Sequence, residues 1–117
     1  MERIARYGKS RARPGHGEEL ARHLLAAADN LRDDPGCELY LINRQADDPD
    51  VVWVTELWRS QADLDAALAK IRGSEGVAEV MALVDEWQMI ELDLLGGKGP
   101  GDDSGELGDG RVQSGSS

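Results

Sequence analysis

The residues whose types and spacing best suit chemistry lie in the segment Thr55-Glu56-Leu57-Trp58. Side chains alternate between the two faces of an extended strand, so Glu56 and Trp58 share one face. If helices cover that face, an acid and a large aromatic ring point into the layer between sheet and helices. A carboxyl buried there without a partner is costly or has a raised pKa, which predicts a polar cavity and makes Glu56 a catalytic candidate. The alternative is that Trp58 is ordinary core and Glu56 pairs with an arginine near the rim.

Other polar residues close to the predicted strands are candidates for binding a substrate. Tyr40 and Asn43 fall on opposite faces of one strand, so at most one of them can face such a cavity. Arg72 is a third candidate. His23 lies at the edge of an apolar helical stripe and is expected to be a boundary residue rather than a base. Cys37 is expected to be a small packed residue, because nothing basic lies beside it in the sequence.

The sequence contains no strong motif for a metal, a phosphate or a nucleophile. No His/Cys cluster has metal-ligand spacing, no glycine-rich loop opens a helix, and no serine lies in a nucleophile elbow. The formal net charge of −10, from 23 acidic and 13 basic residues, repels phosphate backbones and anionic membrane surfaces. We therefore expect no metal, no nucleic acid partner and no membrane partner.

The hydrophobic pattern predicts four strands and two helical regions. The strands are expected at residues 3–9, 37–45, 51–58 and 87–95. A first helix opens at Glu18 and stops at the Asp-Asp-Pro-Gly turn at 33–36. Ser60 is a good N-cap for the second helical region, which Gly73 and Gly76 divide into one broken helix or two short ones. The later part of that region carries an apolar stripe at Val77, Val80, Met81 and Val84.

The order β-α-β-β-α-β is the ferredoxin-like α+β pattern, which places both helical regions on one face of a four-stranded antiparallel sheet. The strand at 51–58 is apolar on both faces: Val52, Val54 and Trp58 lie on one, and Val51, Trp53 and Leu57 lie on the other. The helices can cover only one of these faces. We therefore expect a homodimer with sheet against sheet; the alternative is a monomer with a partly wet, mildly apolar face.

The composition changes abruptly at Gly96. Residues 96–117 are rich in Gly, Ser and Asp and contain few large apolar side chains, so they cannot offset their ordering entropy. We expect one domain at 1–95 and a disordered tail at 96–117. The single cysteine, and the lack of an apolar segment of signal-peptide or membrane-spanning character, lead us to expect a cytoplasmic protein.

Several short motifs give the chain a resemblance to a known family. They are the Pro14-Gly15 turn, Pro35-Gly36-Cys37, Asp47-Asp48-Pro49 in the predicted hairpin, and Glu56-Leu57-Trp58 followed by Ser60-Gln61-Ala62-Asp63-Leu64-Asp65. With these motifs the sequence resembles the antibiotic biosynthesis monooxygenase family, of the quinol monooxygenase kind, over residues 3–94.

The resemblance implies a dimeric α/β barrel with a pocket between sheet and helices in each protomer. It also implies oxygenation of a small phenol, naphthol or quinol by molecular oxygen without metal or flavin, in which the deprotonated aromatic itself reduces oxygen. Trp58 would stack on or wall the substrate. Glu56 or Asn43 would hydrogen-bond its oxygens, and Arg72 would act as an electrostatic stabiliser.

The sequence departs from this family at one position. Family members commonly place a His on the second helix, and the corresponding residue here is Ala67. A haem-handling role, which would need that His as an iron ligand, is therefore not expected. The alternative to the monooxygenase is a non-catalytic dimeric domain of the same fold that binds a small ligand or has a regulatory role.

Overall fold

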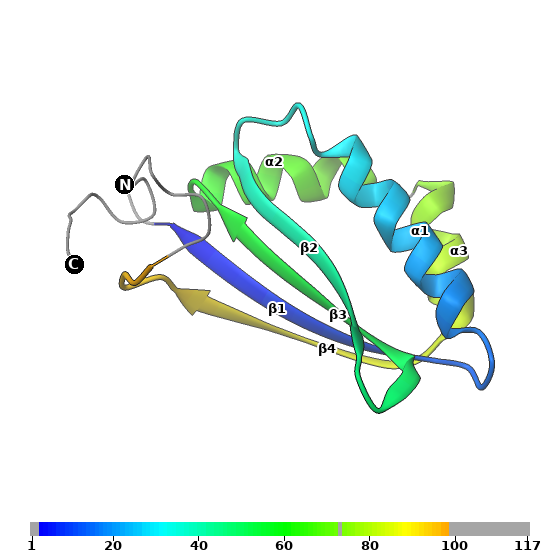
Figure 1. Ribbon diagram of the computed structural model, residues 1–117. Coiled ribbons are helices and arrows are strands. Elements are labelled where there is room, and N and C mark those ends of the chain that lie inside the picture. The colour runs from blue at the N-terminus through cyan, green and yellow to red at the C-terminus, as the bar shows by residue number, and fades with distance from the viewer. Residues whose placement is uncertain (1–2, 73, 99–117) are drawn as a thin grey trace.

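The computed structural model describes residues 3–72 and 74–98, which form one antiparallel sheet covered by three helices (Figure 1). The elements in chain order are β1 (Ile4–Ala12), α1 (Gly17–Asn30), β2 (Cys37–Gln45), β3 (Asp48–Trp58), α2 (Gln61–Ile71), α3 (Glu75–Leu83) and β4 (Val84–Asp93). The strands lie in the order β2-β3-β1-β4, and every neighbouring pair is antiparallel. All three helices cover the same face of the sheet. The predicted ferredoxin-like α+β fold is confirmed.

The start of α1 is held by a residue from a different part of the chain. His16 at the N-cap position makes no side-chain capping bond. Instead, Asp50 at the beginning of β3 accepts hydrogen bonds from the backbone N–H groups of Gly15 and Gly17, both at 3.0 Å. A carboxylate at a helix N-terminus satisfies orphan donors and complements the helix dipole. The hairpin between β2 and β3 therefore anchors the first helix.

The second helical region consists of two short helices. Ser60 caps α2, as predicted, by accepting a hydrogen bond from the backbone N–H of Asp63 at 3.2 Å. Ser74 caps α3 in the same way through Val77. Two separate N-caps favour two helices over one broken helix.

The boundaries of three strands differ from those predicted. β1 continues to Ala12, β3 begins at Asp48 within the predicted turn, and β4 runs from Val84 to Asp93 rather than over 87–95. The pattern placed Val84 on a helical stripe, but it pairs with Ala12 across the sheet. Strand pairing of a β-branched residue has overridden the helical spacing here.

Two apolar clusters fill the layer between sheet and helices. One cluster joins α1 and α3 to the sheet and contains Ala12, Leu20, Ala21 and Val52. The other lies under α2 and contains Trp58, Leu64 and Ala67, with Ile4, Leu31, Cys37 and Leu68 packed against it. Burial in this second cluster raises the pKa of the Cys37 thiol to about 11, as suits a packed and protonated cysteine.

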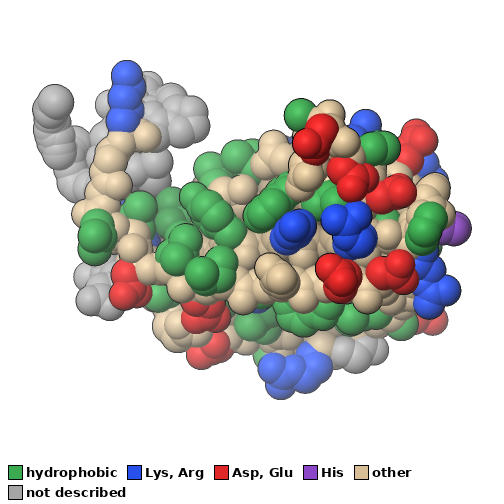
Figure 2. All heavy atoms as spheres, turned by 90° about the horizontal axis from the view of Figure 1, so that it is seen from below, with side chains coloured by type: hydrophobic (Ala, Val, Ile, Leu, Met, Phe, Trp, Pro, Cys, Tyr) green, Lys and Arg blue, Asp and Glu red, His purple; other side chains and the backbone are tan. Residues whose placement is uncertain are grey.

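The face of the sheet opposite the helices is partly apolar, and Figure 2 shows hydrophobic side chains spread over a large part of it. Strand alternation and register place Tyr7, Leu41, Ile90 and Leu92 there, exposed by between 39% and 55%. By contrast, Val51 and Leu57 of β3 are covered within the single chain. The exposed apolar side chains on this face therefore come from β1, β2 and β4, and not from Val51 and Leu57 of β3.

The predicted tail begins at the limit of the described part of the chain. Residues 96–98 are neither helix nor strand, and residues 99–117 lie outside the described residues. The division into a domain at 1–95 and a disordered tail stays a prediction. None of the described helices has the length and apolar character needed to cross a bilayer.

Candidate functional site

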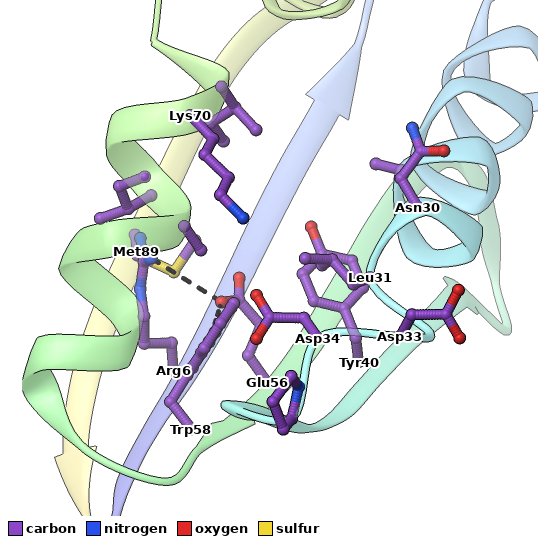
Figure 3. Close-up of a pocket in the computed structure, with 15 residues that line it drawn as sticks. Arg6, Asn30, Leu31, Asp33, Asp34, Tyr40, Glu56, Trp58, Lys70 and Met89 are labelled. Atoms are coloured by element: carbon purple, nitrogen blue, oxygen red, sulfur yellow. Dashed lines mark hydrogen bonds and ion pairs between the residues drawn. The ribbon is translucent and has the colours of Figure 1, made fainter.

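A cavity of about 590 Å³ lies between the sheet and the helices α1 and α2. Its floor and one wall come from the strands, its other walls from the helices, and part of its rim from the loop that follows α1 (Figure 3). The lining residues are Arg6, Tyr40, Glu56, Trp58 and Met89 from the sheet, Ala27 and Asn30 from α1, Leu31, Asp33, Asp34 and Pro35 from the C-cap and loop that follow it, and Ala67, Leu68, Lys70 and Ile71 from α2. The cavity predicted beside Glu56 is present, although its lining is mostly apolar and only part of it is polar.

Glu56 is 5% exposed and makes its polar contacts through one oxygen. The indole Nε1 of Trp58 donates a hydrogen bond to Glu56 Oε1 at 2.8 Å, and Nη1 of Arg6 lies 3.7 Å from the same oxygen. Among the described residues, none donates a hydrogen bond to Oε2. Protein contacts therefore position the carboxylate through Oε1, and Oε2 is free to accept a hydrogen bond from a ligand in the cavity.

Both expectations for this pair hold in part. Trp58 is buried core, and Glu56 does pair with an arginine, as the alternative had it. Yet both residues also line the cavity. Burial raises the pKa of Glu56 above its ordinary value, while the hydrogen bond from Trp58 and the charge of Arg6 oppose the rise and Glu91 adds to it. A carboxyl shifted upward in this way is better matched to proton transfer near neutral pH.

A row of four polar side chains crosses the sheet, and three of them, Tyr40, Glu56 and Arg6, line the cavity. Strand register pairs Tyr40 with Glu56, Glu56 with Arg6, and Arg6 with Glu91, so the row spans all four strands. Figure 3 shows the Glu56 carboxylate between Arg6 and Tyr40. Burial and the neighbouring Glu56 raise the pKa of Tyr40 to about 12, so its hydroxyl stays protonated and can donate a hydrogen bond.

Arg6 belongs to the polar residues near the predicted strands, but it is not among the site residues predicted from the sequence. Its side chain is 12% exposed and lines the cavity. Beyond the ion pair with Glu56 it makes no hydrogen bond to the described residues, and its Nε is sealed from solvent without a partner. No sequence signal marks this position, because Arg6 and Glu56 are brought together only by the register of β1 and β3.

The remaining predicted site residues lie away from this cavity. Asn43 is exposed on the opposite face of the sheet, where it pairs in register with Trp53. Arg72 is exposed at the C-cap of α2 and does not line the cavity. His23 lies outside it as well, with Nδ1 3.6 Å from Glu79 Oε1 of α3. The structure thus brings Glu56, Trp58 and Tyr40 together and separates Asn43 and Arg72 from them; their roles toward a substrate stay predictions.

Met89 is a further cavity residue that the sequence did not point to. It is directly paired with Gly8, and a Cβ added at Gly8 would meet Met89 Cε at 2.9 Å and Sδ at 3.4 Å. The absence of a side chain at Gly8 therefore gives the thioether room to lie along the sheet. In register, Met89 is the diagonal neighbour of Arg6, so it helps to enclose the guanidinium.

The α2 wall is apolar near the carboxylate and charged near the rim. Ala67 is buried beside Trp58 and presents only a methyl group. Lys70, farther along α2, extends toward the cavity in Figure 3. Within residues 3–72 and 74–98, no three His, Cys, Asp or Glu side chains gather as a metal site would require.

Comparisons with known proteins agree with this fold and this part of the chain. The family model described as antibiotic biosynthesis monooxygenase matches residues 3–71. A solved structure from Chloroflexus aurantiacus, whose name assigns it provisionally to the antibiotic biosynthesis monooxygenases, is 30% identical, with a TM-score of 0.72 over 85% of this chain and 99% of that one.

Two other solved structures are similar. A Pseudomonas aeruginosa protein is 26% identical, with a TM-score of 0.66 over 81% of this chain and 96% of that one. A Deinococcus radiodurans protein, named in the same provisional way as the Chloroflexus one, is 20% identical, with a TM-score of 0.70 over 96% and 99% of the two chains, and at that identity it supports the fold alone. No curated protein matches the sequence.

Proposed function

Because the chain belongs to the antibiotic biosynthesis monooxygenase family, we propose that it is an oxidoreductase that oxidises a small phenol, naphthol or quinol with molecular oxygen and without a cofactor. The observation that supports this most is Glu56, a buried carboxylate with one oxygen free of protein donors, at the floor of a cavity of about 590 Å³. That volume is within the range of small-molecule sites.

In the proposed reaction, Glu56 Oε2 takes the hydroxyl proton of the bound aromatic. The resulting phenolate transfers one electron to oxygen, and the aryloxyl radical and superoxide combine through a new carbon–oxygen bond. The peroxide then takes the proton from Glu56, its oxygen–oxygen bond breaks, and the ring carbon loses its hydrogen. One oxygen atom remains on the ring as a quinone carbonyl, and the other leaves as water, so phenol plus oxygen gives quinone plus water.

The surrounding side chains have distinct parts in this proposal. The Trp58 ring walls the cavity, and its Nε1–H orients the carboxylate. The Tyr40 hydroxyl, which stays protonated at working pH, donates to an oxygen of the substrate. Apolar groups such as Leu31 at the C-cap of α1 and Leu68 of α2 keep water from the reactive phenolate. The single cysteine is consistent with work in a reducing cytoplasm.

Oxygen consumption tests the proposal directly. Metal-free protein incubated with a panel of naphthols and quinols is expected to consume oxygen faster than buffer, with one quinone formed per oxygen molecule. An oxygen electrode and absorbance of the product measure the two quantities. Uptake at the buffer rate for every compound would count against the enzyme.

A non-catalytic ligand-binding domain is the second candidate, and Ala67 favours it, because the α2 residue buried beside Trp58 presents a methyl group instead of the His that the family commonly has there. Thermal stabilisation by a small aromatic without any turnover would support this candidate. Turnover of any of the panel compounds would remove it.

We also propose that the protein works as a homodimer, joined through the open face of the sheet. The exposed side chains of Tyr7, Leu41, Ile90 and Leu92 support this, because a monomer rarely leaves such a group of apolar residues in water. Members of the family are typically dimeric.

Changing one residue of this face to a charged one is expected to separate the protomers. Leu41→Glu places a carboxylate in the proposed interface and is expected to give a monomer in sedimentation at micromolar concentration. Leu25→Glu, at an equally exposed leucine on α1, is the matched control and is expected to leave the dimer intact. Wild-type protein that sediments as a monomer would contradict the proposal.

A further inference from the structure

We propose that Arg6 and Glu56 together recognise two oxygens on neighbouring ring carbons, so that the cavity selects ortho-dihydroxy aromatics over rings that carry a single hydroxyl. This inference rests on the proposed function, because it names the substrate class of the same site. It makes Arg6 the residue that determines specificity, with Glu56 as its partner.

Arg6 lacks hydrogen-bond acceptors for most of its donors. A guanidinium has five N–H donors, and a nearly buried one is normally surrounded by acceptors. Here the side chain is 12% exposed, its closest carboxylate oxygen is 3.7 Å from Nη1, and it makes no hydrogen bond to the described residues. Nε is buried without a hydrogen-bond partner, whereas the two Nη atoms keep some surface that a ligand can reach. The outer edge of the guanidinium is therefore the part that a ligand oxygen in the cavity reaches.

The Arg6 guanidinium lies beside a free acceptor, the Oε2 atom of Glu56. Trp58 and Arg6 both contact Glu56 through Oε1, which leaves Oε2 to accept a hydrogen bond. Arg6 and Glu56 are directly opposite one another on adjacent strands. Donor and acceptor thus lie side by side at the cavity floor, as two adjacent oxygens on one ring do. One hydroxyl donates to Glu56, and the neighbouring oxygen accepts from Arg6.

The charges around the pair favour a neutral ligand over a carboxylate. Arg6 is flanked in register by Glu56 and Glu91, and the cavity rim carries Asp33 and Asp34. These four acids outnumber the two bases Arg6 and Lys70, so an added anion meets net negative charge, whereas a neutral diol brings oxygens without net charge. A single hydroxyl that donates to Glu56 brings no second oxygen for Arg6. Sites built to bind a polar group discriminate against ligands that lack it.

The test is a binding comparison in oxygen-free buffer, so that no turnover occurs. Wild-type protein is titrated calorimetrically with 1,2-dihydroxynaphthalene, with its isomer 1,4-dihydroxynaphthalene, and with 1-naphthol. The 1,2-isomer is expected to bind about tenfold or more tightly than either of the others, as one added charge-assisted hydrogen bond would give. Equal affinities for the three compounds would overturn the inference, and this comparison needs no variant.

Arg6→Lys then tests the residue itself. Lysine keeps the positive charge beside Glu56 but loses the planar fork. The variant is expected to bind 1-naphthol within about threefold of wild type while losing most of the preference for the 1,2-isomer. Unchanged preference, or an equal loss of affinity for both compounds, would show that Arg6 only supports Glu56. Arg22→Lys, at an exposed arginine of α1, is the control and is expected to keep the preference.

The outcome is independent of catalysis. If no compound supports oxygen uptake but the 1,2-preference and its loss in Arg6→Lys are observed, the inference stands and the monooxygenase proposal fails. If naphthols are oxidised but all three compounds bind equally well, the monooxygenase proposal stands and the inference about Arg6 fails.

Discussion

Replacing Glu56 by glutamine is expected to reduce the rate of oxygen uptake by about 100- to 10,000-fold, the usual contribution of a general base. The amide has nearly the shape of the carboxylate, and its oxygen can still accept the hydrogen bond from Trp58 Nε1, but it cannot take the hydroxyl proton of the substrate. The rate is measured with an oxygen electrode at saturating substrate. Glu18→Gln, at an exposed residue of α1, is the matched control and is expected to keep the full rate.

The pH dependence separates this role from a purely structural one. Glu56 acts as a base only when ionised, and burial places its pKa above the ordinary 4.5. The wild-type rate is therefore expected to fall as the pH drops through this raised pKa. Trp58→Phe keeps a ring but removes the hydrogen bond that stabilises the carboxylate, so this limb of the profile should move to higher pH. A Glu56→Gln variant with the wild-type rate and profile would refute the assignment.

We expect the Glu56→Gln variant to lose activity without losing stability. Because the pKa of Glu56 is raised in the folded state, the folded protein holds this proton more tightly than the unfolded chain does. The carboxyl therefore contributes stability that is present at low pH and lost as the pH rises through the raised pKa. Glutamine cannot ionise, so the variant is expected to be at least as stable as wild type at neutral pH. Loss of activity then cannot be attributed to unfolding.

Gly17→Ala is expected to lower the free energy of unfolding by about 3 kcal/mol, near the upper end for overpacking. A Cβ at this position would overlap the carbonyl oxygen of Pro49 and lie 2.7 Å from the Cα of Asp50. Both are backbone atoms, which cannot rotate away as the end of a side chain can. The change would push α1 from the hairpin and break the bond by which Asp50 Oδ1 accepts from the N–H of residue 17.

Urea denaturation followed by circular dichroism measures this effect. Gly76→Ala in α3 is the matched control, because its added Cβ would meet only Ser74 Oγ, at 3.9 Å. That variant is expected to be stabilised by roughly 0.5–1 kcal/mol, since alanine loses less backbone entropy in a helix. If the midpoints of Gly17→Ala and wild type coincide, the close approach of α1 to the hairpin is not a constraint on the fold.

The order of elements and part of the site could be predicted from local pattern. Ser60 at an N-cap, the apolar stripe of the first helix and the dense β-branched run of 51–58 each act within a few residues. Alternation along one strand likewise places Glu56 and Trp58 on a common face, and the structure confirms that both reach the cavity. The helical spacing of apolar residues gave a wrong prediction at Val84, which lies in a strand because it pairs with Ala12.

The sequence by itself therefore determined the ferredoxin-like order of strands and helices and the placement of an acid and a tryptophan on one face of a strand, because helix and strand periods and caps are local properties of the chain. Only the tertiary structure decided what surrounds that acid. Arg6 lies beside Glu56 through strand register, and Asp50 caps α1 from the hairpin. Such contacts join residues that are dozens of positions apart, and register across a sheet depends on how whole strands pack together. The carboxylate that the sequence identified became a candidate base through neighbours that the fold supplied.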